Sequence, residues 1–304
     1  MWREPLIGRR DPPCAMRPLD VNGVSLFWDE RGVGPPVVFV HGIPTDYRAW
    51  ENQTAALSAG FRTITYSRRY AYPNTRTGDL SDSTIENNAA DLAGLITKLG
   101  LEPAHLVGHS YGGFIAAYLA TRQPELLRSL TLVEPALASL LLRNPRSRSE
   151  AFGLLLRHPR IALSASRFLR RSQRPALEAL ARHDLLGAVR SNLDGVEDRP
   201  GVLEQLPEPI RQMMVDNART VKETDIPYPP LSLAELGSLR LPTLMLHGQT
   251  GVLWLRAVAR MAAAAIPGCQ RLEIPSSGHY PHVQNPAAFN AALEPFLKRV
   301  SAAP

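Results

Sequence analysis

The sequence predicts an α/β fold in which a mostly parallel sheet is covered by helices on both faces. Short apolar runs alternate with helical patterns, a Gly-x-Ser-x-Gly motif joins a strand to a helix, and about 100 residues lack strand patterns. A chain of 304 residues accommodates one large domain with an insertion. We therefore expect an N-terminal arm at residues 1–18, a core domain at 19–136 and 238–304, and an inserted helical cap at 137–237.

The first elements predict a sheet that opens with an antiparallel hairpin. Asn22-Gly23 stands between two β-like runs, which is the strongest short hairpin signal. Residues 37–40 are an apolar run typical of a strand covered on both faces, and residues 62–66 are predicted to form the next strand. A helix beginning near Asp46 joins these two strands.

Start and stop signals define the next helix. Ser83 and Glu86 form a capping-box pattern, helical apolar spacing follows, and Gly100 ends the helix. A strand at 104–107 precedes the serine motif, a helix at 114–120 follows it, and the strand at 130–133 ends at Glu134.

The inserted segment is helical and punctuated by prolines. Its predicted helices cover residues 149–156, 176–189 and 209–221. Strands at 243–246 and 271–274 then resume the alternation, with helices at 253–266 and 286–300. Ligands of such sheets bind at the carboxyl ends of the strands. The residues at those ends are Ile43, Ser110, Glu134, Gln249 and His279.

The motif around Ser110 carries the chemistry. Gly108-His109-Ser110-Tyr111-Gly112 matches the G-x-S-x-G nucleophile elbow, which places a serine on a sharp turn between a strand and a helix. The alternative is a tight glycine turn with an incidental serine. The flanking strand and helix favour the elbow.

These segments resemble the cap-bearing branch of the α/β-hydrolase superfamily, near its esterases and lactonases. The resemblance covers about residues 21–298 and is weakest in the cap. It rests on His41-Gly42-Ile43-Pro44, on Gly108 to Gly113, and on Ser277-Gly278-His279 followed by Gln284-Asn285-Pro286. It implies that Ser110 is the nucleophile, that His279 is its base, and that the backbone N–H groups of Ile43 and Tyr111 form the oxyanion hole.

The triad acid departs from the pattern of many relatives. They carry it after the penultimate strand, but no Asp or Glu occurs between Glu235 and Glu273. Other members of the superfamily place the acid where Glu134 stands, so we expect Glu134 to orient His279. The alternatives are a Glu134 that caps the first turn of the cap, an acid elsewhere such as Asp46, or a Ser-His dyad.

Four further histidines and one loop compete for roles. We expect His282 to form a pocket wall, His41 and His109 to brace their loops, and His247 to pack at a strand end. The loop at residues 66–74 has three tyrosines and two arginines where relatives have an acidic, glycine-rich turn. It could shape a pocket or stabilise itself, and we assign it no role.

Composition constrains the setting of the protein. Residues 1–16 contain arginines and prolines but no apolar h-region, so we expect neither a signal peptide nor an anchor. Cys14 and Cys269 are the only cysteines, too few for a disulfide framework or a structural zinc site, and we expect a cytoplasmic protein. Only three of the 34 basic residues are lysines, a bias typical of GC-rich bacterial genes.

The positive charge is concentrated at the start of the cap. The whole chain has a formal charge of +6, and residues 140–182 contain ten arginines against Glu150 and Glu178. The favoured interpretation is a solvated helical face whose arginine stems cover apolar surface. The alternatives are an electrostatic funnel for anionic substrates and docking on an anionic membrane, of which membrane docking is disfavoured.

Together these patterns predict a metal-independent serine hydrolase, without a cofactor, that cleaves a small carboxylic ester or lactone. Carbon–carbon bond hydrolysis and cofactor-free perhydrolysis are alternatives on the same site. A ligand-sensing protein with slow turnover is an alternative from another class. A nucleic-acid module is disfavoured because the basic residues lack interleaved stacking aromatics. A homodimer is left open. Serine cannot form the alkyl-ester intermediate of the dehalogenases and epoxide hydrolases that use an aspartate at the elbow.

Overall fold

The computed structural model describes residues 16–74, 78–142 and 147–302. Within these residues, eight strands form one sheet in the order β1-β2-β4-β3-β5-β6-β7-β8. β2 runs antiparallel to β1 and β4, and the other neighbours are parallel. The strands are β1 (Arg17–Val21), β2 (Val24–Arg31), β3 (Pro36–Val40), β4 (Arg62–Tyr66), β5 (Ala104–His109), β6 (Leu127–Val133), β7 (Thr243–Gly248) and β8 (Gln270–Ile274). The predicted fold class, a mostly parallel sheet with an inserted helical region, is confirmed.

The opening hairpin forms at the predicted turn. Asn22 and Gly23 have φ angles of 49° and 76°, the left-handed conformations that a two-residue type I′ turn requires. β1 begins at Arg17, inside the range expected for the arm. The remainder of that range through residue 15, including Cys14, lies outside the described residues.

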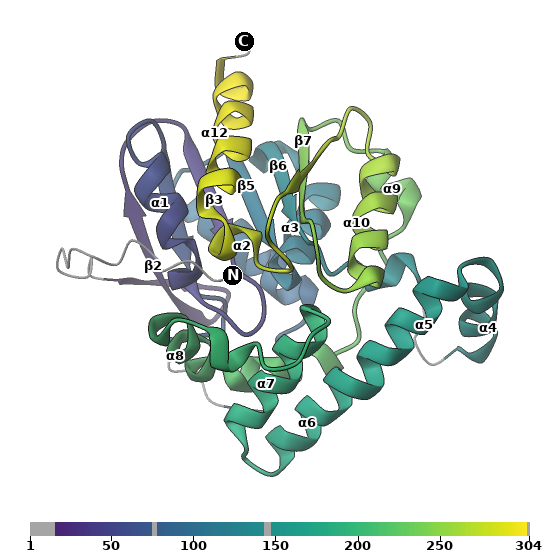
Figure 1. The fold of residues 1–304 in the computed structure, drawn as a ribbon. Helices are drawn as coiled ribbons and strands as arrows, with labels where there is room; N and C mark the ends of the chain where they lie inside the picture. Colours follow the sequence, from purple (N-terminus) through teal and green to yellow (C-terminus); the bar gives the residue numbers. More distant parts are fainter. Residues whose placement is uncertain (1–15, 75–77, 143–146, 303–304) are drawn as a thin grey trace.

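Helices cover both faces of the sheet, and alternation along β3 explains the two cores. Val38 and Val40 pack in one cluster with side chains of α2, α3 and α10, whereas Val37 and Phe39 pack in a second cluster with side chains of α1 and α12. Figure 1 shows the layers. These covering helices are α1 (Glu51–Leu57), α2 (Ile85–Lys98), α3 (Tyr111–Arg122), α10 (Leu253–Ala265) and α12 (Pro286–Ala302).

The region between β6 and β7 is helical, and α6, α7 and α8 lie together at one end of the sheet (Figure 1). Its helices are α4 (Arg148–Arg157), α5 (Pro159–Phe168), α6 (Arg174–Ala181), α7 (Leu185–Val196), α8 (Glu208–Asp216) and α9 (Leu233–Gly237). A π-helical turn, Leu169–Gln173, joins α5 to α6. The limits 137–237 of the cap domain stay a prediction.

Three helix boundaries differ from the predictions. The segment 176–189 is divided between α6 and α7, because Asp184 caps the N-terminus of α7 by accepting from the Gly187 N–H. The segment 209–221 ends as α8 and continues as a 3₁₀ helix, Ala218–Asp225. The cap of α2 is Thr84 rather than Ser83, since Thr84 Oγ1 accepts from the Asn87 N–H. α5 was not predicted.

Among the described residues, no helix has both the length and the apolar character needed to cross a membrane.

Candidate active site

Ser110 stands at the turn between β5 and α3 in a strained conformation. Its φ of 52° and ψ of −115° lie in a region that non-glycine residues rarely adopt. Hydrogen bonds fix the turn from both sides: the Ser110 N–H donates to the Val133 carbonyl at 2.9 Å, and the Ser110 carbonyl accepts from Phe114 N–H at 3.1 Å and Ala136 N–H at 3.0 Å. The neighbouring strand and helix therefore hold the serine in place.

Close backbone approach explains the glycines of the elbow. A Cβ at Gly108 would lie 2.5 Å from the Gly112 carbonyl oxygen, and one at Gly112 would lie 2.4 Å from the Val40 carbonyl oxygen. Only glycine fits either position without a backbone shift.

His279 reaches Ser110 from the loop after β8. Its Nε2 lies 2.9 Å from Ser110 Oγ, and both side chains are buried. The serine hydroxyl donates to Nε2 when the imidazole proton is on Nδ1. The predicted nucleophile and the predicted base are thus within hydrogen-bonding distance.

Glu134 approaches the other nitrogen of His279. Its Oε2 lies 3.5 Å from His279 Nδ1, an ion-pair distance longer than a normal hydrogen bond. Its Oε1 accepts from the Gly248 N–H at 2.9 Å. Glu134 has a φ of 45°, so this residue also adopts a left-handed conformation at the end of its strand. Asp46, the other candidate acid, instead pairs with Arg48 at 2.6 Å.

Burial governs the protonation of both groups. It raises the pKa of Glu134 to about 7, against the opposing effect of the Gly248 N–H. It lowers the pKa of His279 to about 3. At neutral pH the resting imidazole is therefore uncharged, which is the state that accepts the serine proton.

The two predicted oxyanion donors lie just after two strand ends, and Tyr111 directly follows the serine in the sequence. Tyr111 is the first residue of α3, and the first amides of a helix have no acceptor within it. Ile43 follows β3, and its carbonyl accepts a hydrogen bond from Tyr280 Oη at 3.2 Å. Neither position needs a particular side chain to supply its N–H, so the role of both amides stays a prediction.

His41 and His109 form hydrogen bonds between loops, and burial lowers the pKa values of His41, His109 and His282 well below the usual range. His109 Nε2 donates to the His279 carbonyl at 2.7 Å, and His41 Nε2 accepts from the Arg68 N–H at 3.0 Å. His282 is fully buried and stacks on Trp50, with ring centroids 4.4 Å apart.

At the end of β7, His247 is also buried. Its Nδ1 lies 3.0 Å from the Gly248 carbonyl and its Nε2 lies 2.9 Å from Arg271 Nη1. His247 therefore packs at the strand end as predicted.

Glu197, at the C-terminus of α7, is a buried carboxylate that the sequence analysis missed. Its Oε1 accepts from the His279 N–H at 3.1 Å and from Gln284 Nε2 at 3.0 Å. Gly278 leaves room for this carboxylate, because a Cβ there would lie 2.2 Å from Glu197 Oε2. No motif marks Glu197, and 82 residues separate it from His279.

The loop at residues 66–74 attaches the inserted helices to the sheet. Arg68 forms a bidentate ion pair with Glu223, at 3.1 and 2.8 Å, and each side chain is 1% exposed. The Tyr72 N–H donates to Asn217 Oδ1 at 2.8 Å. Arg68 thus anchors the 3₁₀ helix Ala218–Asp225 through a buried ion pair that the sequence does not indicate.

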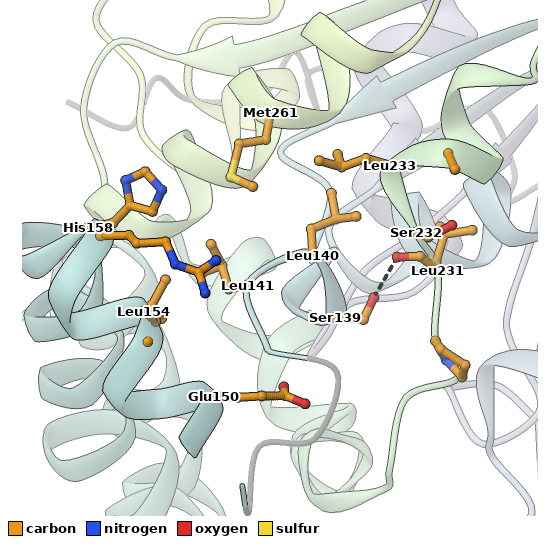
Figure 2. A pocket seen from close by; sticks show the side chains of 14 residues that line it. Ser139, Leu140, Leu141, Glu150, Leu154, His158, Leu231, Ser232, Leu233 and Met261 are labelled. Carbon is orange, nitrogen blue, oxygen red and sulfur yellow. Dashed lines mark hydrogen bonds between the residues drawn. The ribbon is translucent and has the colours of Figure 1, made fainter. Parts of the chain in front are cut away.

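The described residues contain no group of three or more His, Cys, Asp or Glu side chains arranged to hold a metal ion. A cavity of about 910 Å³ lies between α4, α9 and α10, and neither Ser110 nor His279 lines it (Figure 2).

Comparison with known proteins gives a family match. The profile of the alpha/beta hydrolase fold family matches residues 35–286. The non-heme chloroperoxidase CPO-A1 of Kitasatospora aureofaciens is 35% identical over 138 residues, which are 45% of this chain and 48% of that protein. The chain thus matches about half the length of this curated relative.

Solved structures match over most of the chain. The carboxylesterase CesB (YbfK) of Bacillus subtilis has a TM-score of 0.68 and 20% identity, covering 93% of this chain and 90% of that one. The enol-lactonase of Burkholderia xenovorans LB400 has a TM-score of 0.62 and 22% identity, covering 93% and 100%. At these identities the two structures support the fold.

Proposed function

We propose that this chain, which belongs to the alpha/beta hydrolase fold family, is a serine hydrolase that cleaves a small carboxylic ester or lactone through an acyl-enzyme. The observation that carries the proposal is the 2.9 Å approach of His279 Nε2 to Ser110 Oγ on a strained turn. An uncharged histidine at this distance can take the serine proton, which an alcohol needs before it attacks a carbonyl.

In the acylation step, Ser110 Oγ attacks the carbonyl carbon while its proton passes to His279 Nε2. The N–H groups of Ile43 and Tyr111 stabilise the oxyanion, and each such donor contributes roughly 3 kcal/mol to the transition state. Glu134, 3.5 Å from Nδ1, stabilises the imidazolium that forms. His279 then protonates the leaving alkoxide, which departs as the alcohol, or stays attached to the acyl group if the substrate is a lactone.

Deacylation uses the same residues with water as the nucleophile. His279 takes a proton from water as its oxygen attacks the acyl carbon, and it returns the proton to Ser110 Oγ when the carbon–oxygen bond to serine breaks. The carboxylic acid leaves and the resting state is restored.

The test combines labelling with turnover. Intact-mass measurement after treatment with a fluorophosphonate should show one label, and a panel of p-nitrophenyl esters of rising chain length plus several lactones should show release of acid. A protein that takes no label and turns over no member of the panel would contradict the proposal. Thermal stabilisation by a lactone without turnover would favour a ligand-sensing protein instead.

Perhydrolysis is a second candidate, favoured by the similarity to a protein named as a non-heme chloroperoxidase. Here hydrogen peroxide replaces water in deacylation, so the acyl group leaves as a peracid and serine regains its proton. Halide oxidation by that peracid in acetate buffer would depend on Ser110. Equal halide oxidation by wild type and Ser110→Ala would remove this candidate.

A further inference from the structure

Of the first two helices of the inserted region, α5 packs one side against the core through Ile161, Ala165 and Phe168, whereas no side chain of α4 packs there. Neither α4 nor α5 contains a buried residue, whereas α7 buries five. Figure 1 shows α4 at the edge of the molecule, far from the sheet. A soluble helix normally buries one apolar stripe. The exposed apolar side chains of α4, and Leu163 on the opposite side of α5 from that stripe, therefore call for an explanation.

α4 has two faces with different surroundings. Its inner face carries Leu154 and Arg157, which line the cavity, and Figure 2 shows Leu154 across it from Leu140 and Met261. The apolar side chains of its outer face recur at positions i, i+3 and i+4 and therefore point the same way. They are Phe152, 61% exposed, Leu155, 43% exposed, and Leu156, 68% exposed.

α5 repeats this combination with more charge. Arg160, Leu163 and Arg167 follow each other at helical spacing, both arginines are exposed, and Leu163 is 60% exposed. Three more exposed arginines follow in the π-helical turn and at the start of α6: Arg170, Arg171 and Arg174. We call Phe152, Leu155, Leu156, Leu163 and these five arginines of α5 to α6 the outer surface.

Little negative charge accompanies the outer surface. Arg167 approaches Asp198 only to 3.9 Å, with both side chains about half exposed. A second copy of this chain would set arginines against arginines if the same surface were used twice. An electrostatic funnel would account for the arginines but not for the exposed Phe152 and leucines. An anionic lipid bilayer accounts for both, since its headgroups take the guanidinium groups and its interface takes the apolar side chains.

We propose that the outer surface docks on an anionic lipid bilayer, with Phe152, Leu156 and Leu163 entering the interface and the arginines contacting lipid phosphates. The proposal does not depend on the chemistry of Ser110. The sequence analysis favoured a solvated helical face for the arginine-rich segment. The proposal replaces that interpretation, because the structure shows exposed apolar side chains and exposed arginines on α4, α5 and the turn that follows.

Vesicle binding of the full chain tests this directly. We expect co-sedimentation with vesicles of phosphatidylcholine and phosphatidylglycerol mixed three to one, and at least about tenfold weaker binding to phosphatidylcholine alone or at high salt. Changing Arg160, Arg167, Arg170 and Arg171 together to Gln should weaken binding by up to roughly 600-fold, since each basic residue at such a surface contributes a factor of about five.

Apolar variants separate insertion from simple charge attraction. The variant F152S/L156S/L163S should lose at least about tenfold in binding, and Phe152→Trp should show a blue-shifted emission with anionic vesicles only. The matched controls are L233S/L272S, which alter exposed leucines elsewhere, and R190Q/R211Q. Both controls should bind as wild type. Unchanged circular dichroism and melting temperature verify the fold of every variant.

Several results would overturn the proposal. Two of them are absence of binding to anionic vesicles and equal binding to neutral vesicles. The third is wild-type binding by F152S/L156S/L163S, because the outer surface would then attract anionic substrates or an acidic protein by charge alone. A concentration-dependent dimer in light scattering that F152S/L156S/L163S abolishes would assign the outer surface to a second copy.

Discussion

The carboxylate of Glu197 accepts a hydrogen bond from the backbone N–H of His279 at 3.1 Å. The same oxygen accepts from Gln284 Nε2, whose amide oxygen in turn accepts from the Gly278 N–H at 2.6 Å. A residue at the end of α7 thus fixes the loop that carries the predicted base. The position of His279 therefore depends on how α7 of the inserted region packs against the His279 loop.

We predict that Glu197→Ala lowers kcat more than it raises KM. The change leaves two buried donors without an acceptor, which costs about 1–3 kcal/mol for each donor, and His279 loses its support. A drop of roughly tenfold to a hundredfold in kcat follows if half or more of that cost falls on the transition state. Glu197→Gln keeps an acceptor oxygen and should recover most of the rate. Glu204→Ala, which removes an exposed carboxylate paired with Arg190, is the control. A KM effect alone would assign Glu197 to substrate binding.

Labelling by a fluorophosphonate should occur on Ser110 and disappear in Ser110→Ala. Ser67→Ala is the matched control, because Ser67 is also buried but its hydroxyl donates to the Tyr72 carbonyl. His279→Ala should lose turnover by several orders of magnitude, since the members of a triad act as a unit. A label that persists without Ser110 would place the nucleophile elsewhere.

Replacing Glu134 by Gln should slow turnover by as much as roughly 10⁴-fold, because the amide favours the wrong tautomer of His279. Steady-state kinetics at pH 8 measure this. Thr250→Asp in a Glu134→Ala background should restore part of the rate, since Thr250 hydrogen-bonds to the Ser277 carbonyl near the His279 loop. Wild-type kcat in folded Glu134→Gln would indicate a dyad or another acid.

The same substitution should stabilise the protein at high pH. The pKa of Glu134 is raised to about 7 from an ordinary 4.5, so folding favours its neutral form. Stability from this group is full below the unfolded pKa and is lost as pH rises through about 7. Urea unfolding above pH 7 should find Glu134→Gln more stable by up to roughly 3 kcal/mol, and the difference should vanish near pH 4. A constant difference across pH would mean that the pKa of Glu134 does not change on folding.

The pH profile of kcat/KM should fall on the acid side near pH 7. Burial lowers the pKa of His279 to about 3, so protonation of Glu134 comes first as pH falls and removes the charge that stabilises the imidazolium. This acid limb of the pH profile reports the coupled titration of Glu134 and His279 rather than the pKa of either residue alone. In Glu134→Gln it should move to lower pH. A limb that stays in place would assign it to a different group.

Breaking the Arg68–Glu223 pair from one side should cost roughly 3–5 kcal/mol of folding stability, because the other charge stays buried without a partner. Arg68→Met and Glu223→Leu test each side by chemical unfolding. The double variant should be less destabilised than the sum, and it should restore protection of the 3₁₀ helix from hydrogen exchange. Additive losses would show that the two side chains do not depend on each other.

Local patterns determined much of this protein. The Asn22-Gly23 turn, the apolar strands and the elbow glycines predicted the opening hairpin, the alternation of strands and helices, and the turn that carries Ser110, because turn geometry and backbone crowding act between neighbouring residues. The positions of Ser110, Glu134 and His279 at strand ends followed from the parallel sheet, which brings those ends to one edge. No Asp or Glu occurs between Glu235 and Glu273, which includes the loop after β7, and this absence indicated Glu134 as the acid.

Tertiary structure decided what depends on contacts between distant segments. Glu197 meets His279 and Arg68 meets Glu223 across 82 and 155 residues, and no spacing rule specifies such pairs. The sequence predicted Ser83 as the N-cap of α2, but Thr84 is the N-cap in the structure, because the Ser83 hydroxyl donates to Glu223 in the inserted region. Likewise, the composition of the arginine-rich segment does not distinguish a helix that packs against the core from one that is exposed. Only the packing of α4 and α5 shows which apolar side chains remain in water, since burial is a property of the whole fold.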